Sequence, residues 1–185
     1  MPYYLLIVGD PAKIPYSFQY QLDVQYAVGR IHFDNLDDYA KYAHNDVQTE
    51  SGKLQLTRQA AFFGVHNDSD RATELSSSEL VEPVAQVLTE KRAQWEIRKL
   101  LAAQATKEQL GKLMGGDETP ALLFTASHGV GFPTDTDMQP RFQGALLCQD
   151  WPGRLDWHGP LSRDHYFGAE DISANAQMLG MIAVH

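Results

Sequence analysis

The sequence predicts an α/β fold with a mostly parallel central sheet. Short apolar runs bounded by Gly, Pro or polar residues recur along the chain, and such runs are typical of strands covered on both faces. From residue 59 to residue 128, apolar runs alternate with segments that carry helix-start signals. The resulting order of strand, helix, strand, helix, strand favours parallel strands joined by right-handed crossovers.

The composition is that of a folded protein with no strong electrostatic partner. The 185 residues are 43% hydrophobic and 21% charged, which supplies a core and argues against disorder. The formal net charge is −9 and no Lys/Arg cluster stands out. We therefore expect neither nucleic acid nor an anionic membrane as a main partner.

The cysteine count and the N-terminal sequence favour a reducing compartment. Cys148 is the one cysteine, so no internal disulfide can form. No basic region precedes the apolar run 3–8, and no run approaches the roughly 20 apolar residues of a membrane span. We expect a cytoplasmic protein, unless the chain was cut from a longer one.

Residues 1–52 predict a segment of a preceding α/β subdomain. Strands are expected in it at 3–8 and around 24–28. A helix is expected from Asn35 to about Glu50, because a capping residue precedes it and acidic residues occupy its first turn. A Ser-Gly-Lys sequence then breaks the helix, so we place the second part of the chain at 53–185.

The second part predicts a parallel sheet. Its strands are expected at 59–66, 95–101, 121–128 and 180–185. The Ser76–Glu79 spacing is that of a capping box, and Pro83 in the first helical turn shifts the expected helix start to Ser78 or Glu79. A second capping box, Thr106–Gln109, predicts a short helix.

The segment after residue 128 has no helical period at its start. Residues 144–151 predict a strand, and residues 156–159 are its expected antiparallel partner in a hairpin. A modest helical signal covers 167–179. Glu170 and Asp171 within it have two interpretations, the lining of a specificity pocket and a solvated helix start.

The strand expected at 121–128 ends on His128, which Gly129 follows. In open parallel sheets, chemistry gathers at the carboxyl ends of the strands. An imidazole there can act as a general base, and a glycine beside it lets a substrate carbonyl approach a backbone amide, as in an oxyanion site. The alternative is a histidine that merely ends a strand and bonds a loop.

Cys148 is the obvious partner for His128, since a thiolate–imidazole pair is a familiar hydrolytic device. The residues between the two show no helical crossover, so the strand that holds Cys148 fits a hairpin better than the next parallel strand. A mid-strand cysteine usually packs as a small hydrophobe. Both interpretations of Cys148 stay open, and a nucleophile is otherwise expected just after the run 181–184.

Other enzyme classes lack their motifs in this sequence. No GxSxG elbow indicates an α/β hydrolase, and no Gly-rich loop at a strand–helix junction indicates a nucleotide-binding enzyme. The seven histidines include no HExxH pair.

In its ordered blocks the chain resembles the caspase-like cysteine peptidases, and within them the gingipain-type branch. That family carries an apolar strand ending in His-Gly, a hairpin, and a second apolar strand ending in a catalytic Cys, often as Ala-Cys. Residues 122–129 match the first block, and residues 181–185 resemble the start of the second block without its Cys. Upstream, residues 6–15 and 26–31 resemble the segment that precedes the catalytic subdomain.

The resemblance implies a caspase-like three-layer sandwich with a hairpin after the third core strand. It also implies a cysteine endopeptidase that acts on protein or peptide substrates. His128 would be the acid–base of a Cys–His dyad, and the Gly129 amide would help hold the oxyanion. The resemblance requires no cofactor and no metal. Residues 53–185 would be the catalytic subdomain, incomplete at its C-terminus.

The expected cysteine does not follow Val184 in this sequence. The chain is then a fragment, a processed piece whose partner is the remainder of its own polypeptide or another chain, or an enzyme with Cys148 as a relocated nucleophile. The alternative function is a catalytically inactive caspase-like module that acts as a scaffold or interaction partner.

Overall fold

The computed structural model describes residues 2–54 and 56–185. The chain divides into two compact units, Met1–Lys53 and Leu54–His185, and each is described by itself. The division lies next to the boundary expected from the sequence. Among the described residues, no helix is long and apolar enough to cross a membrane.

The smaller unit contains two parallel strands and two helices. Its elements are β1 (Tyr4–Val8), α1 (Tyr16–Asp23), β2 (Ala27–Ile31) and α2 (Leu36–Glu50). The first strand and α2 are confirmed. The second strand was expected too early, because Val24 still has helical backbone angles at the end of α1, a helix that the sequence analysis missed.

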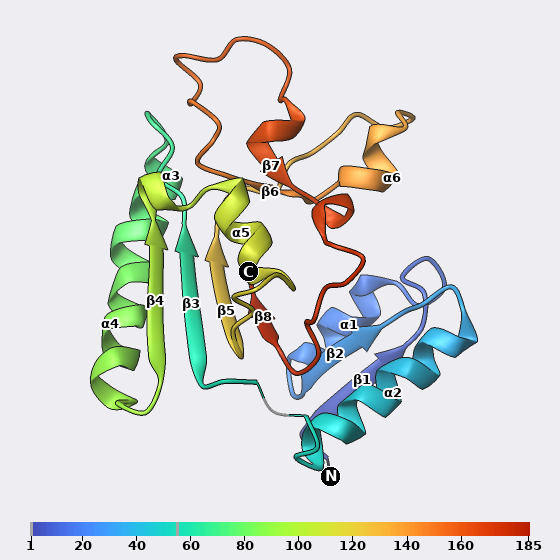
Figure 1. Ribbon diagram of the computed structural model, residues 1–185. Helices are drawn as coiled ribbons and strands as arrows, with labels where there is room; N and C mark the ends of the chain where they lie inside the picture. The colour runs from blue at the N-terminus through green and yellow to red at the C-terminus, as the bar shows by residue number, and fades with distance from the viewer. Residues whose placement is uncertain (1, 55) are drawn as a thin grey trace. The chain divides into compact units, whose positions relative to one another are not determined.

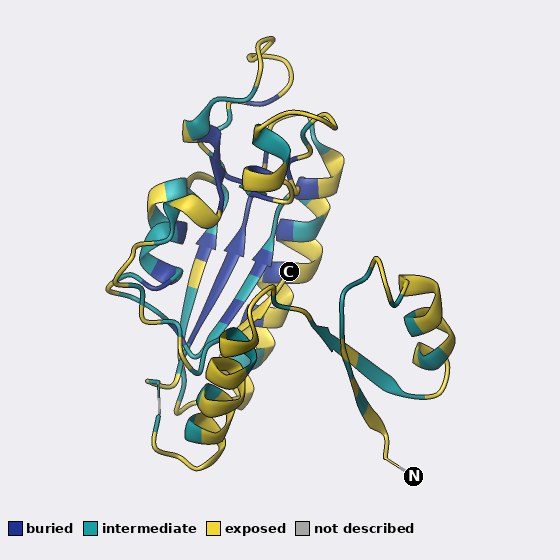
Figure 2. Ribbon diagram, turned by 90° about the vertical axis from the view of Figure 1, so that its right-hand side faces the viewer, coloured by how far each residue is buried: buried dark blue, intermediate teal, exposed yellow. Residues whose placement is uncertain are grey.

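The sheet of the smaller unit is poorly covered. Along β1, exposed and half-buried residues alternate, and the apolar side chains of Tyr4, Leu6 and Val8 lie exposed on one face. Figure 2 shows the contrast with the larger unit, whose central strands are largely buried.

The larger unit is organised around a four-stranded sheet with the order β4-β3-β5-β8. Its strands are β3 (Gln59–Gly64), β4 (Glu96–Leu101), β5 (Leu122–Ala126) and β8 (Ile182–Val184). Every pairing between them is parallel. The expected strands and their parallel direction are confirmed, including a final strand that lies beside β5.

Helices cover both faces of this sheet (Figure 1). They are α3 (Arg71–Leu75) and α4 (Glu82–Lys91) on one face, and α5 (Lys107–Leu113) on the other. Alternate residues of β3 supply the two cores, because successive strand side chains point to opposite faces. Phe62 packs in one cluster with Ala85, and Phe63 packs in the other with Leu110. Helix layers on both sides of a parallel sheet are the arrangement of a three-layer sandwich.

The helix of the first face begins earlier than expected. Asp70 caps it by accepting a hydrogen bond from the Ala72 N–H, and α3 continues through a π-helical turn (Ser76–Val81) into α4. The capping box expected at Ser76–Glu79 is therefore wrong. Both residues lie inside the π turn, where the Ser76 hydroxyl donates to the Thr73 carbonyl.

The π turn accommodates Pro83. Proline has no N–H, so an α-helix that continues through it loses one hydrogen bond. Immediately before it, the Glu82 N–H donates to the carbonyl of Ser77, five residues back, as in a π-helix. The π turn therefore ends directly before the first turn of α4, which contains Pro83 and its missing N–H donor. At α5 one half of the expected capping box is confirmed, since the Thr106 hydroxyl accepts from the Gln109 N–H, while the Gln109 side-chain oxygen accepts from Nη2 of Arg98.

Between β5 and β8 the chain forms an excursion with a small core of its own. Its elements are α6 (Met138–Phe142), β6 (Leu146–Leu147) and β7 (Tyr166–Phe167). It also contains short 3-10 turns at Arg163–His165 and Ala169–Asp171. A further 3-10 turn, Ala102–Gln104, lies between β4 and α5. β6 and β7 pair in antiparallel fashion. The buried residues of this core are Val130, Phe142, Ala145, Leu147 and Tyr166.

The excursion corrects two expectations. The partner of the β6 strand is Tyr166–Phe167 and not 156–159, because Tyr166 packs into the small core and Phe167 into the main core, while residues 154–160 lie exposed. The helix expected over 167–179 is a single 3-10 turn, in which the Asp171 carboxylate accepts from the Gly168 N–H. The chain then turns extended at Ile172.

Candidate active site

The carboxyl ends of three neighbouring strands lie at one edge of the larger sheet. β3, β5 and β8 are adjacent and parallel, so their carboxyl ends share this edge. Asp70 lies in the loop after β3, and His128 and Gly129 lie just beyond β5. Val184, the last residue of β8, pairs with Phe124. The end of β8 therefore lies two residues short of the end of β5, and His185, which follows it, lines the same cavity as His128.

His128 and Asp70 form a close pair. Nε2 of His128 lies 2.5 Å from Oδ2 of Asp70. The imidazole is half-exposed, with 48% of the side chain accessible, whereas the Asp70 side chain is 23% exposed. A partly shielded carboxylate that holds one ring nitrogen fixes the orientation of the ring and leaves its other nitrogen free to act.

The backbone of the α3 start holds Asp70 in place. Its Oδ1 accepts from the Ala72 N–H at 3.1 Å, and its own N–H donates to the carbonyl of the buried Asn67. Burial on its own would raise the pKa of Asp70. Hydrogen bonds and charge from His128, with the amides of Ala72 and Thr73, outweigh burial and hold that pKa below its usual value. Asp70 is therefore an ionised partner for His128 at neutral pH.

The backbone N–H of Gly129 is free to donate. Gly129 forms an antiparallel bridge with Leu146. The flanking bonds run from the Leu147 N–H to the His128 carbonyl and from the Val130 N–H to the Ala145 carbonyl. This is the pattern of a non-hydrogen-bonded pair, in which both residues point their N–H and C=O groups away from each other. Among the described residues, none accepts from the Gly129 N–H.

Cys148 lies apart from these groups. The side chain is fully buried in the core cluster that also holds Phe63 and Leu110, and its Sγ donates to the Leu146 carbonyl. Burial, with a smaller effect of the Asp150 charge, raises the pKa of the Cys148 thiol to about 12. Within the described part of the chain, Cys148 lines neither cavity that His128 lines. Its surroundings are those of a core residue and give a nucleophile no support.

A cavity of about 310 Å³ opens at the tips of β5 and β8, between these strands and the helix of the first face. Ser127 and His128 line it from the segment just after β5, and Thr73 and Ser76 line it from α3 and the π turn. His185 lines it beyond β8, with its Nδ1 2.5 Å from Oγ1 of Thr125. The cavity therefore gathers the imidazole of His128 and the carboxyl end of the neighbouring strand.

Glu170 and Asp171 both take part in ion pairs. Glu170 holds Arg141 through both carboxylate oxygens, and Asp171 pairs with Lys107 and Arg163. Arg141 in turn lines a cavity that adjoins Gly129. In the part of the chain that the structure describes, no three His, Cys, Asp or Glu side chains gather as a metal site.

Comparison with the models of protein families, with curated proteins and with solved structures finds no match. The site therefore has to be interpreted from its own residues.

Asp70 is the member of this candidate site that the sequence analysis missed. The polar loop after the strand expected at 59–66 was recognised only as a loop. Two signals could have found it: Asp70 follows a strand at the same edge as His128, and it stands two residues before an amide that needs a cap.

Proposed function

We propose that this chain carries the histidine side of a cysteine endopeptidase site of caspase-like fold. The observation that carries the proposal is the parallel pairing of β5 with β8, because the chain that leaves β8 at His185 enters the same cavity that His128 lines. A nucleophile held just after β8, at the position where the resemblance expects a cysteine, would face the imidazole.

The pair of His128 and Asp70 is suited to the proton transfers of such a site. An ionised carboxylate only accepts hydrogen bonds, so Nε2 of His128 carries the proton that faces Asp70. In the neutral form of this imidazole Nδ1 is unprotonated and can take the proton of a thiol that lies on its side of the ring. The same nitrogen can return the proton to the leaving amine when the acyl-enzyme forms. Water then hydrolyses the acyl-enzyme with His128 as the base.

The backbone supports the stabilisation of the oxyanion. The unpaired N–H of Gly129 lies next to His128 and points away from Leu146. A free backbone donor beside the base is suited to the negative charge that develops on a carbonyl oxygen under attack. Because Gly129 has no side chain, the substrate carbonyl can approach this donor closely.

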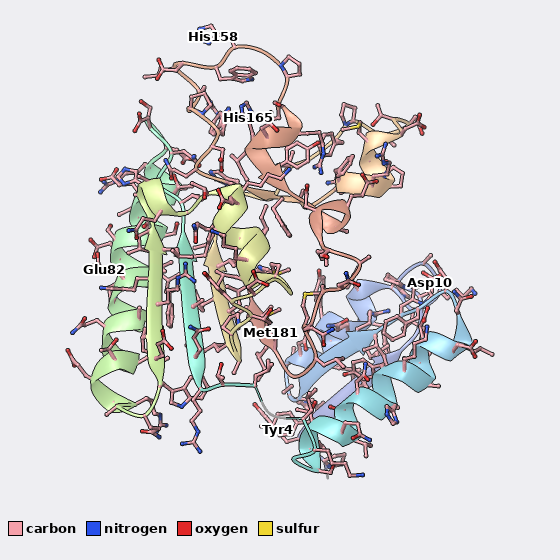
Figure 3. The ribbon with its side chains drawn as sticks, viewed as in Figure 1. Tyr4, Asp10, Glu82, His158, His165 and Met181 are labelled. Carbon is pink, nitrogen blue, oxygen red and sulfur yellow. The ribbon has the colours of Figure 1, made fainter. Side chains whose placement is uncertain are left out.

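The test is covalent labelling of the natural full-length polypeptide that contains these 185 residues. A peptidyl acyloxymethyl ketone with Ala next to the reactive group should modify one cysteine, located by peptide mass mapping. We expect this cysteine to follow β8 and not to be Cys148. The variant His128→Ala should abolish labelling. His158→Ala is the matched control, because His158 is exposed in the loop between β6 and β7, away from the sheet (Figure 3).

The second candidate is the inactive caspase-like module. The observation that favours it is the outer position of β8, whose Ile182 and Val184 side chains are 65% and 40% exposed. An outer strand with exposed apolar residues can pair with another chain. If the polypeptide takes up no label and cleaves no peptide, the peptidase proposal fails and this function remains.

A further inference from the structure

A second and larger cavity lies next to the proposed oxyanion group. It has a volume of about 580 Å³, and Gly129 lines it. Ser127, Leu146 and His185 line both this cavity and the one that contains His128. A substrate carbonyl held by the Gly129 amide would therefore place a neighbouring side chain of the peptide at this cavity.

The walls of the larger cavity are mostly apolar. Phe142, Ala145 and Phe167 form part of them, and their own side chains are almost fully buried in the surrounding cores. Met114 and Ile172 pack against the main core and also reach the cavity. These surfaces offer contact area to a hydrocarbon or aromatic side chain and few hydrogen-bond partners to a polar one.

The arginine of the lining is already paired. Nε and Nη2 of Arg141 donate to the two carboxylate oxygens of Glu170 at 2.6 and 2.8 Å, and the guanidinium lies over the Phe142 ring. An acidic substrate side chain would have to displace Glu170 from this bidentate pair. A basic side chain would meet Arg141 itself and lose water against apolar walls. The cavity is thus matched to an uncharged side chain.

We propose that the cavity beside Gly129 is a specificity subsite for a large apolar side chain, such as Leu, Met or Phe, on a residue next to the scissile bond. This inference rests on the proposed peptidase function and adds the substrate class. The residue occupies the position directly before or directly after the bond, and the experiment identifies which of the two.

The experiment is cleavage-site profiling. The natural full-length polypeptide is incubated with a mixture of unrelated peptides, and mass spectrometry identifies every bond that is cut. We expect Leu, Met and Phe to be enriched at one of the two positions that flank the bond. Asp, Glu, Lys and Arg should be depleted there.

A substitution that fills the cavity assigns the preference to it. Ala169 lines the cavity and is exposed, so Ala169→Phe should fit the fold while occupying part of the space. Cleavage at Leu, Met and Phe should fall at least about tenfold, whereas cleavage at Ala and Gly should persist. Ala93→Phe is the matched control, since Ala93 is exposed in the turn between α4 and β4. Ile172→Ala enlarges the same cavity and should shift the preference toward larger side chains.

The outcomes separate the two proposals. Three outcomes would contradict the subsite but not the peptidase function. They are cleavage without an apolar preference, a preference for charged residues, and an unchanged profile in both cavity variants. If no peptide is cleaved and no label is taken up, the peptidase function fails and the subsite fails with it.

Discussion

His128 and Cys148 lie on two segments that hydrogen-bond to each other, but their side chains lie in opposite environments. The Leu147 N–H, one residue before Cys148, donates to the His128 carbonyl at 2.8 Å. Yet the imidazole is half-exposed beside Asp70, and the thiol is fully buried among core residues. A backbone contact between two segments therefore does not bring their side chains together as a dyad, because successive side chains of an extended chain point to opposite sides.

The largest effect is expected on peptide cleavage. We expect His128→Ala to lower kcat/KM of the natural polypeptide by about 10³-fold, because it removes the acid–base group. Cys148→Ala should leave kcat/KM per folded molecule unchanged within about twofold, since the thiol lies outside the cavities of the site. Initial rates on the best peptide from the profiling measure both. Equal losses of kcat/KM in the two variants would contradict the separation of Cys148 from the site of His128.

The second effect concerns the reactivity of the thiol. Only the thiolate is nucleophilic, and a pKa of about 12 leaves very little thiolate at pH 8. Iodoacetamide should therefore modify Cys148 at least about 100-fold more slowly in the native polypeptide than in urea. Peptide mapping at timed intervals follows the reaction. Comparable rates in the two states would mean that the thiol is accessible.

The substitution Gly129→Ala tests whether the backbone amide of Gly129 takes part in cleavage. A Cβ on Gly129 would come no closer than 3.8 Å to its nearest neighbour, Gly144, and the backbone angles need no glycine. The fold should tolerate the change. Cleavage should fall about tenfold, because a methyl group obstructs the approach of the substrate carbonyl to the amide. Unfolding curves at pH 7 check the fold, and a variant with full activity would remove Gly129 from the mechanism.

The smallest effect is the pH dependence of stability. The folded-state pKa of Asp70 lies below the usual pKa of an aspartate in an unfolded chain, so its stabilising contribution is complete above that usual pKa and is lost as pH falls through the folded pKa. Asp70→Asn should abolish this part of the acid destabilisation, a difference of less than about 1 kcal/mol. Urea unfolding between pH 7 and pH 2 measures it. Asp68→Asn, two positions earlier and exposed, is the control and should behave like the unsubstituted protein.

The main sheet could be predicted from the sequence because its signals are local. Apolar runs bounded by turn residues placed β3, β4, β5 and β8, and the Thr106 cap placed α5. The position of His128 at a strand tip followed from the same runs. These elements are specified by residues within a few positions of one another.

The features that were not predicted depend on contacts between residues far apart in the sequence. The partner of β6 lies at Tyr166–Phe167 because Tyr166 is buried in the small core and Phe167 in the main core, and no local turn signal marks that pairing. The contact between Asp70 and His128 joins residues 58 positions apart. The helix start at Arg71 was not predicted because two strong start signals, Ser76 and Pro83, lie inside the continuous helical segment, the first in the π turn and the second in α4.

The π turn at Ser76–Val81 also bears on how the chain can change in length. A π turn follows from one residue more than a regular helix would use over the same rise. Removing one residue there would let α3 and α4 merge into one regular helix, with Asp70 and the sheet-facing residues of α4 keeping their places. This stretch is therefore a natural position for single-residue insertions and deletions that spare both ends of the helix.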